Sequence, residues 1–515
     1  MLRYLKRRFF SSPLWAVVLF SSVLLYGCKD GFDDYWDNGK PKGGYLYNKL
    51  KDNPEFSIFV EGLERTQIDQ FVNKGGLYTV FAPTNEAFQN FFTTRGYTSI
   101  SDVPPDELFE ILSFHIVNNM WYYYDLKARY NSDAKSELYL TRNKKFVKID
   151  VLTENTLKIN DVAVINTLRD IDADNGVIHG IGQVLVPLPN LEQVLQKDPE
   201  FVNSTFYQLM QLTADSAYDS RNSFDRNRDG RIDSVFFKTY PFLSEVNTSL
   251  EYRANNAVSN QGGDPVYTTV LIPSNAVLNP FLAPALARVG NDITLLSPSY
   301  AEAVLESYFL SERKISAAEL TARPVVLRTV NSEILPALPD SRFIRKNVEA
   351  SNGIVHLINI IFPESDRLKS AVGKAMTDPD LSMFMAALQR AGVMGQWALT
   401  SKDGTFFAPT NAAFEAAGLD VEKRVLNGAQ LTATQFNTIV RHHLINSNLN
   451  QAALTGTRDS DLGNTQQLVF ATSNGATTVR SQGGVVATVQ IPALIVGPAS
   501  KGYVYKVDKV LLPFQ

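Results

Sequence analysis

Residues 79–88 read Thr-Val-Phe-Ala-Pro-Thr-Asn-Glu-Ala-Phe, and the same pattern returns twice further along the chain. Residues 269–278 read Thr-Val-Leu-Ile-Pro-Ser-Asn-Ala-Val-Leu, and residues 405–414 read Thr-Phe-Phe-Ala-Pro-Thr-Asn-Ala-Ala-Phe. Each copy begins with an apolar run that favours a β-strand and ends at a proline. The Thr or Ser and the Asn after the proline are residues that cap helices. Each copy therefore predicts a strand that turns directly into a helix.

Three further landmarks accompany each copy in the same order. Each copy opens on a proline motif before a helix: Asn53-Pro-Glu-Phe56, Asp198-Pro-Glu-Phe201 and Asp378-Pro-Asp-Leu381. Apolar residues at i, i+3, i+4 and i+7 then predict the buried stripe of a second helix, which ends at His115, Tyr308 or His443. Each copy closes on a strand that runs from glycine to proline, over residues 176–187, 353–363 and 502–513. The order of the landmarks indicates three copies of one folding unit.

These landmarks resemble the fasciclin domain, whose two characteristic blocks read like Thr-Val-Phe-Ala-Pro-Thr-Asn-x-Ala-Phe and Asn-Gly-x-x-His-x-x-x-x-x-Leu-x-Pro. The resemblance covers about residues 45–515 and is weakest in the middle copy, which has Ile-Pro-Ser-Asn. It implies an α+β fold of three tandem fasciclin-like domains, each a wedge of two β-sheets with several short helices along one edge. We expect these domains at 45–190, 191–364 and 365–515.

The first 28 residues have the layout of a bacterial lipoprotein leader. Four basic residues precede an apolar run from Leu14 to Tyr26 that is too short to span a membrane. Leu25-Tyr26-Gly27-Cys28 resembles a lipobox, in which the chain's single cysteine is lipidated. We expect a signal peptide at 1–27 and a lipidated tether at 28–44, held to the membrane by acyl chains alone. The alternative is a buried cysteine in an uncleaved anchor.

Charge and composition narrow the class of protein. The chain has 515 residues, and without residues 1–27 it carries 45 basic and 53 acidic residues. This balance predicts no nucleic-acid partner. The acidic cluster within residues 30–37 resembles tags of surface-exposed lipoproteins, which predicts a lipid-anchored protein of the outer membrane that faces the exterior; the alternative is a solvated tether.

The sequence lacks the standard catalytic signatures. It has no Gly-x-Ser-x-Gly, no His-Glu-x-x-His and no phosphate-binding Gly-x-x-x-x-Gly-Lys. Six ring residues stand instead at matching places in the copies: His115, His179, Tyr308, His356, His443 and Tyr505. Because tyrosine replaces histidine at both kinds of position, we predict hydrogen-bonded core residues rather than metal ligands. We expect no enzyme, although a hydrolase with two carboxylates from distant strands stays an alternative.

The middle copy contains an insertion of about 45 residues, at about residues 210–262. Within it, oxygen-bearing side chains and a glycine follow the spacing that begins a calcium loop and resemble EF-hand-type repeats. The candidate ligands are Asp225, Asn227, Asp229, Arg231 and Asp233. The twelfth position, where such loops carry glutamate, is Phe236, and arginines separate the ligands. A structural Ca²⁺ site and a polar turn both fit this pattern.

Two aromatic groups are candidate ligand-binding surfaces. The first is Trp121-Tyr122-Tyr123-Tyr124; in a strand, alternate rings of this segment would face opposite sides, and one pair would stack on sugar rings. The second lies in the insertion and includes Phe237 and Tyr240. Such stripes are also typical of protein cores.

Together these features predict a surface-anchored adhesion protein that contacts extracellular matrix, cells or polysaccharide. The alternative is a non-catalytic docking or spacer subunit of an outer-membrane glycan-uptake or envelope complex. A broad apolar face favours docking onto an envelope protein, whereas a groove with paired aromatic rings favours a glycan.

Overall fold

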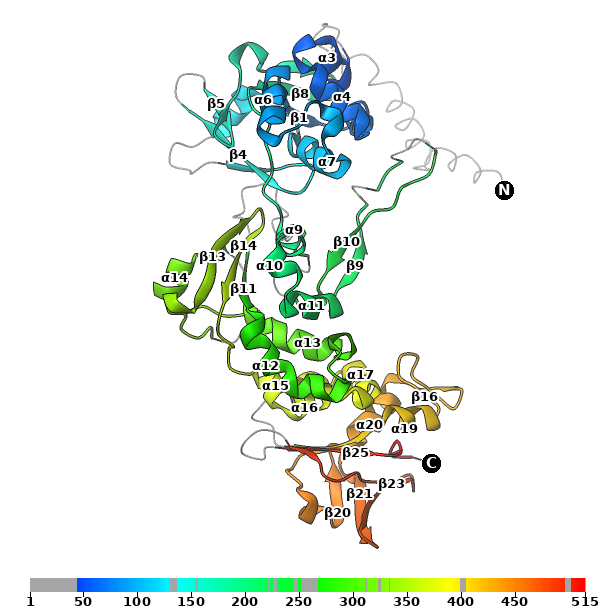
Figure 1. Ribbon diagram of the computed structural model, residues 1–515. Coiled ribbons are helices and arrows are strands. Elements are labelled where there is room, and N and C mark those ends of the chain that lie inside the picture. The colour runs from blue at the N-terminus through cyan, green and yellow to red at the C-terminus, as the bar shows by residue number, and fades with distance from the viewer. Residues whose placement is uncertain are drawn as a thin grey trace, which may run out of the picture. The chain divides into compact units, whose positions relative to one another are not determined.

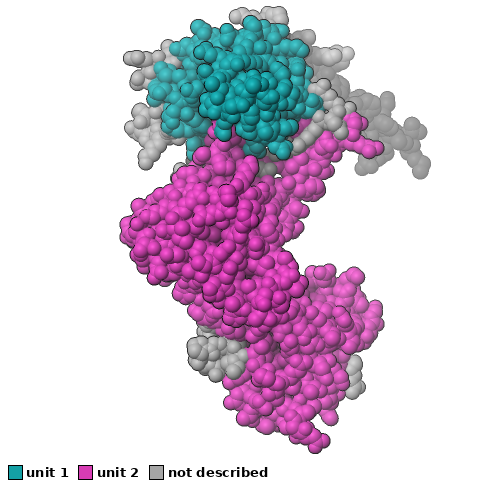
Figure 2. Space-filling view, in the orientation of Figure 1, with its two compact units in different colours: residues 1–142, 147–185 teal, residues 143–146, 186–515 magenta. Residues whose placement is uncertain are grey.

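The computed structural model describes residues 44–129, 137–152, 156–220, 223–225, 229–243, 249–251, 267–310, 313–322, 326–332, 334–398, 404–495 and 502–514. The chain divides into two compact units, which Figure 2 shows in separate colours. Unit 1 comprises residues 1–142 and 147–185, and unit 2 comprises residues 143–146 and 186–515. The predicted leader and Cys28 lie outside the described residues.

Unit 1 contains the first copy of the repeated pattern. Its central sheet has the strand order β2-β1-β8-β7, and a second sheet has the order β3-β4-β5-β6. The strands are β1 (Tyr78–Pro83), β2 (Ile116–Asn118), β3 (Glu137–Leu140), β4 (Phe146–Val151), β5 (Leu157–Ile159), β6 (Val162–Ala163), β7 (Ile171–Ala173) and β8 (Gly176–Ile181). The helices are α3 (Leu46–Asp52), α4 (Ser57–Arg65), α5 (Asp69–Val72), α6 (Asn85–Arg95), α7 (Pro105–Phe114) and α8 (Tyr123–Arg129).

Unit 2 begins with the middle copy, whose sheet has the order β12-β11-β14-β13. Its strands are β9 (Asp215–Tyr218), β10 (Phe236–Thr239), β11 (Thr268–Pro273), β12 (Phe309–Leu310), β13 (Phe343–Ala350) and β14 (Gly353–Ile358). Its helices are α9 (Leu191–Lys197), α10 (Pro199–Val202), α11 (Thr205–Leu212), α12 (Asn275–Leu286), α13 (Pro298–Leu305) and α14 (Ala317–Ala322).

The third copy completes unit 2 and again has two four-stranded sheets, in the orders β19-β15-β25-β24 and β20-β21-β22-β23. A small sheet, β16-β17-β18, precedes its longest helix. The strands are β15 (Gly404–Pro409), β16 (Leu419–Asp420), β17 (Val425–Leu426), β18 (Ala429–Gln430), β19 (Leu444–Ile445), β20 (Gly456–Ser460), β21 (Gly463–Ser473), β22 (Ala476–Arg480), β23 (Val486–Thr488), β24 (Leu494–Ile495) and β25 (Gly502–Val507). The helices are α15 (Asp366–Lys369), α16 (Ala371–Met376), α17 (Ser382–Arg390), α18 (Met394–Trp397), α19 (Asn411–Ala416) and α20 (Ala433–His442).

The central sheets of the three copies share one register. In each copy the strand before the Pro turn runs parallel to the closing strand, and its first residue lies opposite the glycine: Tyr78 opposite Gly176, Thr268 opposite Gly353, and Gly404 opposite Gly502. A Cβ atom on Gly353 would lie 2.2 Å from the Thr268 carbonyl oxygen. Close approach of the two backbones therefore requires glycine at this position.

The middle copy departs from the predicted wedge of two sheets. Among the described residues it has one four-stranded sheet, the ribbon of β9 and β10, and an isolated bridge between Arg328 and Ile334. Pro336 and Pro339 follow that bridge, and neither has an N–H group to donate to a strand ladder. Within the described residues, this copy therefore has one four-stranded sheet where a wedge of two was predicted.

The middle and third copies share one hydrophobic core within unit 2. Helix α13 of the middle copy lies against α15 and α16, as Figure 1 shows. Arg367 of α15 also forms ion pairs with Glu306 at 2.7 Å and Glu302 at 3.7 Å. The middle and third copies thus pack against each other on both sides of the domain boundary predicted after residue 364.

Candidate functional site

In each copy a buried threonine and a ring residue both hydrogen-bond to the backbone of one loop residue. We call this pair of hydrogen bonds the clasp. In unit 1 the Trp121 amide donates to Thr79 Oγ1 at 2.8 Å, and His179 Nε2 donates to the Trp121 carbonyl oxygen at 2.8 Å. Thr79 and His179 are fully buried and lie on the paired strands β1 and β8. The clasp therefore fixes the loop that follows β2.

The same clasp occurs twice in unit 2. Around Ile315, its amide donates to Thr269 Oγ1 at 2.9 Å, and His356 Nε2 donates to its carbonyl oxygen at 2.9 Å. Around Leu449, the amide donates to Thr405 Oγ1 at 2.9 Å, and the Tyr505 hydroxyl donates to the carbonyl oxygen at 2.9 Å. Tyrosine therefore replaces histidine here because both residues can donate to the same carbonyl.

A second set of rings ties the buried helix to the end of each closing strand. The Leu185 amide donates to His115 Nε2 at 3.0 Å, and the Leu511 amide donates to His443 Nε2 at 2.8 Å. In the middle copy the Phe362 amide donates to the Tyr308 hydroxyl at 3.1 Å. Each ring therefore satisfies a backbone N–H that would otherwise be buried without a partner.

These rings are neutral hydrogen-bonding groups. Burial lowers the pKa of His115 to about 4 and that of His443 to about 3, and burial raises the pKa of Tyr308 to about 12. Both nitrogens of His115 are in use, because Nδ1 donates to the Ile111 carbonyl oxygen at 2.8 Å. Within the described ranges, no group of three or more His, Cys, Asp or Glu side chains is placed to hold a metal ion.

The loop predicted to bind calcium forms hydrogen bonds of its own. The Asp225 carboxylate accepts the amides of Asp229 at 3.0 Å and Gly230 at 2.8 Å, and the Asp229 carboxylate accepts the Arg231 amide at 2.8 Å. Gly230 has a φ of +86°, which suits glycine. Asn227 lies outside the described residues. These bonds are those of a polar turn, and calcium binding stays a prediction.

The aromatic run at 121–124 does not form a strand. Trp121 and Tyr122 lie in the clasped loop, and Tyr123 begins helix α8. Trp121 packs edge-on against Tyr139, with ring centroids 5.2 Å apart, and the Tyr122 hydroxyl bonds to Asp172. Only Tyr124 is largely exposed. A strand would have set alternate rings on opposite sides; because the clasp turns the chain here, no flat pair of rings results.

The insertion presents a more exposed apolar surface. β9 and β10 form an antiparallel ribbon (Figure 1). In its register Phe236 lies opposite Tyr218. The two rings meet edge to face, with centroids 5.7 Å apart. Phe236 is 59% exposed, Tyr218 is 49% exposed and Ile232 is 65% exposed. We call these three residues, two on the ribbon and Ile232 on the segment that leads into β10, the ribbon face.

A buried carboxylate anchors this ribbon to the rest of unit 2. Glu192, on α9, is 1% exposed and accepts hydrogen bonds from Lys238 Nζ at 2.8 Å and from the hydroxyls of Tyr207 and Tyr240, both at 2.7 Å. Burial raises the pKa of both tyrosines, so they stay neutral donors. The network holds Lys238 of β10, and with it the ribbon, in place.

Two predicted contact residues have other surroundings in the structure. Tyr240 is fully buried, so its predicted role as a surface contact is wrong; its hydroxyl serves Glu192 instead. Phe237 is half-buried, and Lys144 Nζ of the same unit lies 5.1 Å from its ring centroid. Tyr218 and Ile232 were not among the predicted contact residues, and the pairing of Tyr218 with Phe236 follows only from the register of the ribbon.

The fasciclin domain family model matches residues 54–187 and 379–513, which together make up more than half of the chain. The chain belongs to the fasciclin domain family. The two matched segments are the first and third copies, and both contain the Thr clasp and the two four-stranded sheets. The middle copy, which lies between the matched fasciclin segments, contains the clasp with one such sheet.

Known fasciclin proteins are similar to this chain over different lengths. The transforming growth factor-beta-induced protein ig-h3 of Sus scrofa is 29% identical over 34% of this chain and 23% of its own length. Fasciclin-1 of Schistocerca americana is 22% identical over 90% of this chain and 67% of its own length. A solved FAS1 domain pair from the insect cell adhesion molecule fasciclin I is 16% identical, with a TM-score of 0.24, over 61% of this chain and 98% of that chain. This chain thus spans less than a quarter of the ig-h3 protein.

Fasciclin domains occur in adhesion-related proteins of cell surfaces and the extracellular space. In the part of this fasciclin chain that the structure describes, no helix is long and apolar enough to cross a lipid bilayer.

Proposed function

We propose that this protein is a lipid-anchored surface protein of three fasciclin-like domains that binds matrix, cells or polysaccharide through the ribbon face. The anchor is Cys28, the tether is residues 28–44, and the domains are residues 45–190, 191–364 and 365–515. Membership of the fasciclin family supports an adhesion role. The clasp around Ile315 supports counting the middle copy as a domain.

The exposed ribbon face is the observation that carries this proposal. Tyr218 and Phe236 place two aromatic rings in solvent on one short ribbon, and Ile232 adds an exposed aliphatic side chain on the segment that leads into β10. Exposed aromatic groups of this kind mark contact sites, because burying them against a partner releases water from apolar surface. The Glu192 network holds the ribbon in place, which lowers the entropy lost on binding.

The same face also supports the alternative, a non-catalytic docking or spacer subunit of an outer-membrane glycan-uptake or envelope complex. Ile232 is the most exposed member of the face, and an aliphatic group suits a protein partner better than a sugar. Neither proposal requires catalysis.

Affinity electrophoresis of the purified protein against a panel of polysaccharides and matrix proteins, with calcium and with chelator, tests this function. Retardation on a polymer supports direct binding, and its loss with chelator supports the calcium loop at Asp225. No retardation on any member of the panel would contradict direct binding and leave the docking role.

A further inference from the structure

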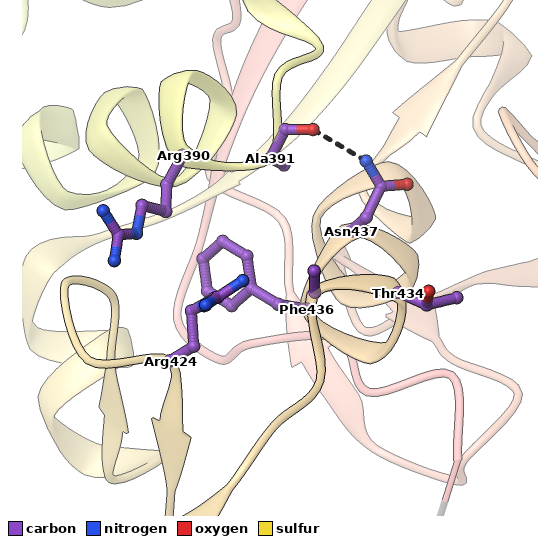
Figure 3. A pocket seen from close by; sticks show the side chains of 7 residues that line it. Arg390, Ala391, Arg424, Thr434, Phe436 and Asn437 are labelled. Atoms are coloured by element: carbon purple, nitrogen blue, oxygen red, sulfur yellow. Dashed lines mark hydrogen bonds between the residues drawn. The ribbon is translucent and has the colours of Figure 1, made fainter. Parts of the chain in front are cut away.

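An open pocket of about 300 Å³ lies in the third copy, away from the ribbon face. The end of α17, the β16–β17 turn and the first turns of α20 form its walls, as Figure 3 shows. Its lining residues are Arg390, Ala391, Arg424, Ala433, Thr434, Phe436 and Asn437. The Asn437 side chain donates to the Ala391 carbonyl oxygen at 2.8 Å and so joins α20 to the end of α17.

The charge of the pocket has one sign. Among the described residues that line it, Arg390 and Arg424 carry positive charge and none carries a carboxylate. Across the described part of the chain, neither arginine takes part in an ion pair, and Arg424 Nε is buried without a hydrogen-bond partner. Two guanidinium groups at one pocket, without carboxylates of the protein to neutralise them, favour an oxyanion as ligand.

The turn that carries Arg424 is held firmly. Arg424 has a φ of +54°, a backbone conformation that few residues other than glycine adopt. The Leu431 amide donates to the Arg424 carbonyl oxygen at 2.8 Å, and Gln430 Nε2 donates to the Lys423 carbonyl oxygen at 2.8 Å. These bonds fix the backbone of the turn that carries Arg424.

The other residues that line the pocket indicate which further groups a ligand should carry. Phe436 and the methyl groups of Ala391 and Ala433 add apolar surface, and the Thr434 hydroxyl adds a polar group. Since one water takes up about 30 Å³ of liquid, the pocket has room for a molecule larger than an inorganic anion. The first turn of α20 also has backbone N–H groups that no helical bond uses. The Gln435 amide donates to the Thr432 side chain at 3.2 Å, and the remaining groups favour negative charge nearby.

We propose that this pocket binds an oxyanion carried on a sugar ring, such as the carboxylate of a uronic acid. The two arginines bind the carboxylate, and the ring lies against the apolar wall. This site is separate from the ribbon face and does not depend on the function proposed for it.

Isothermal titration of the purified protein at constant ionic strength with glucuronate, glucose and inorganic sulfate tests the proposal. We expect binding of glucuronate and none of glucose, because a neutral sugar leaves the guanidinium groups without an anion. We expect sulfate to bind about tenfold more weakly, since it does not use the apolar wall. Failure of glucuronate to bind would overturn the proposal, and equal affinity for sulfate would overturn its sugar component.

Variants locate the site. Arg424→Gln and Arg390→Gln should each weaken glucuronate binding about tenfold or more, the usual effect of losing a charge-assisted hydrogen bond. Arg480→Gln changes an exposed arginine of the same copy outside the pocket and should leave the affinity unchanged. Ala433→Glu places a carboxylate at an exposed first-turn position where it favours the helix, so this variant should fold and yet not bind. Unchanged binding in Arg424→Gln or Ala433→Glu would overturn the site.

Discussion

The hydrogen bond from the Leu185 amide to His115 should weaken on acidification. His115 is buried, and its Nε2 can accept the amide only while the ring is neutral. Burial lowers its pKa to about 4 in the folded state, whereas an exposed histidine titrates near 6.5. In a locally opened state, in which water reaches the His115 ring, the ring therefore takes up a proton at a higher pH than in the folded state. The stability of the folded state against this opening is fully present above about pH 6.5 and is lost as the pH falls towards about 4.

These two pKa values determine how far the opening equilibrium shifts with pH. At pH 5 a histidine with a pKa of about 6.5 is almost fully protonated in the open state, and one with a pKa of about 4 is mostly neutral in the folded state. The opening equilibrium then shifts by about thirtyfold between pH 7.5 and pH 5, or about 2 kcal/mol.

Amide hydrogen exchange, corrected for the intrinsic pH dependence of exchange, measures this shift at Leu185. The Phe362 amide is a matched internal control, because its acceptor is the hydroxyl of Tyr308, whose pKa is raised by burial to about 12. Protection of Leu185 should fall about thirtyfold between pH 7.5 and pH 5, while protection of Phe362 should change much less.

A variant distinguishes the effect of protonating His115 from the effects of other titrating groups. His115→Phe should lower the protection of Leu185 at every pH, since the amide loses its acceptor, and should remove most of the pH dependence. Equal protection of Leu185 at both pH values in the unmodified protein would refute the assignment of His115 as a neutral acceptor.

Two further predictions concern the shared architecture. Thr405→Val should destabilise the third copy by about 1–3 kcal/mol in urea unfolding, because the buried Leu449 amide loses its acceptor; a loss below about 0.5 kcal/mol would contradict a role for the clasp in stability. Gly353→Ala should cost more than about 2 kcal/mol, since the new Cβ would meet the Thr268 carbonyl oxygen, whereas Gly395→Ala has open space and should cost nothing; equal thermal midpoints for the two variants would contradict the close-approach argument.

The repeated landmarks predicted much of the fold because each one encodes a local physical requirement. The Pro-Thr-Asn segment predicted the strand-to-helix turn, and Thr84 and Thr410 do cap helices α6 and α19. The predicted buried stripes correspond to helices α7, α13 and α20, and the mixed α+β class follows from these elements.

Features that depend on residues far apart in the chain could not be predicted from the sequence. The clasp joins Thr79, Trp121 and His179, and nothing local to Trp121 indicates that its backbone is held by two other strands. For the same reason the sequence does not show that the aromatic run turns here instead of forming a strand. Tyr240 lies in an aromatic cluster like its exposed neighbours, but it packs in the core of unit 2 and its hydroxyl donates to the distant Glu192.

The pocket at Arg424 could not be predicted from the sequence either. Arg390 and Arg424 lie on different elements, and the pocket they share forms only when α17, the β16–β17 turn and α20 come together. A positive φ at Arg424 has no signature in the sequence, because arginine is not a residue that favours it.

The central claim, that the ribbon face is the contact surface, is tested most directly by one comparison of binding. The double variant Tyr218→Ser/Phe236→Ser is compared with Leu295→Ser/Ile344→Ser, a matched control in which the replaced side chains are 58% and 51% exposed. Against the polymer or matrix protein that retards the unmodified protein, the ribbon variant should lose affinity by about tenfold or more and the control should lose none. Full retention of affinity by the ribbon variant would contradict the account.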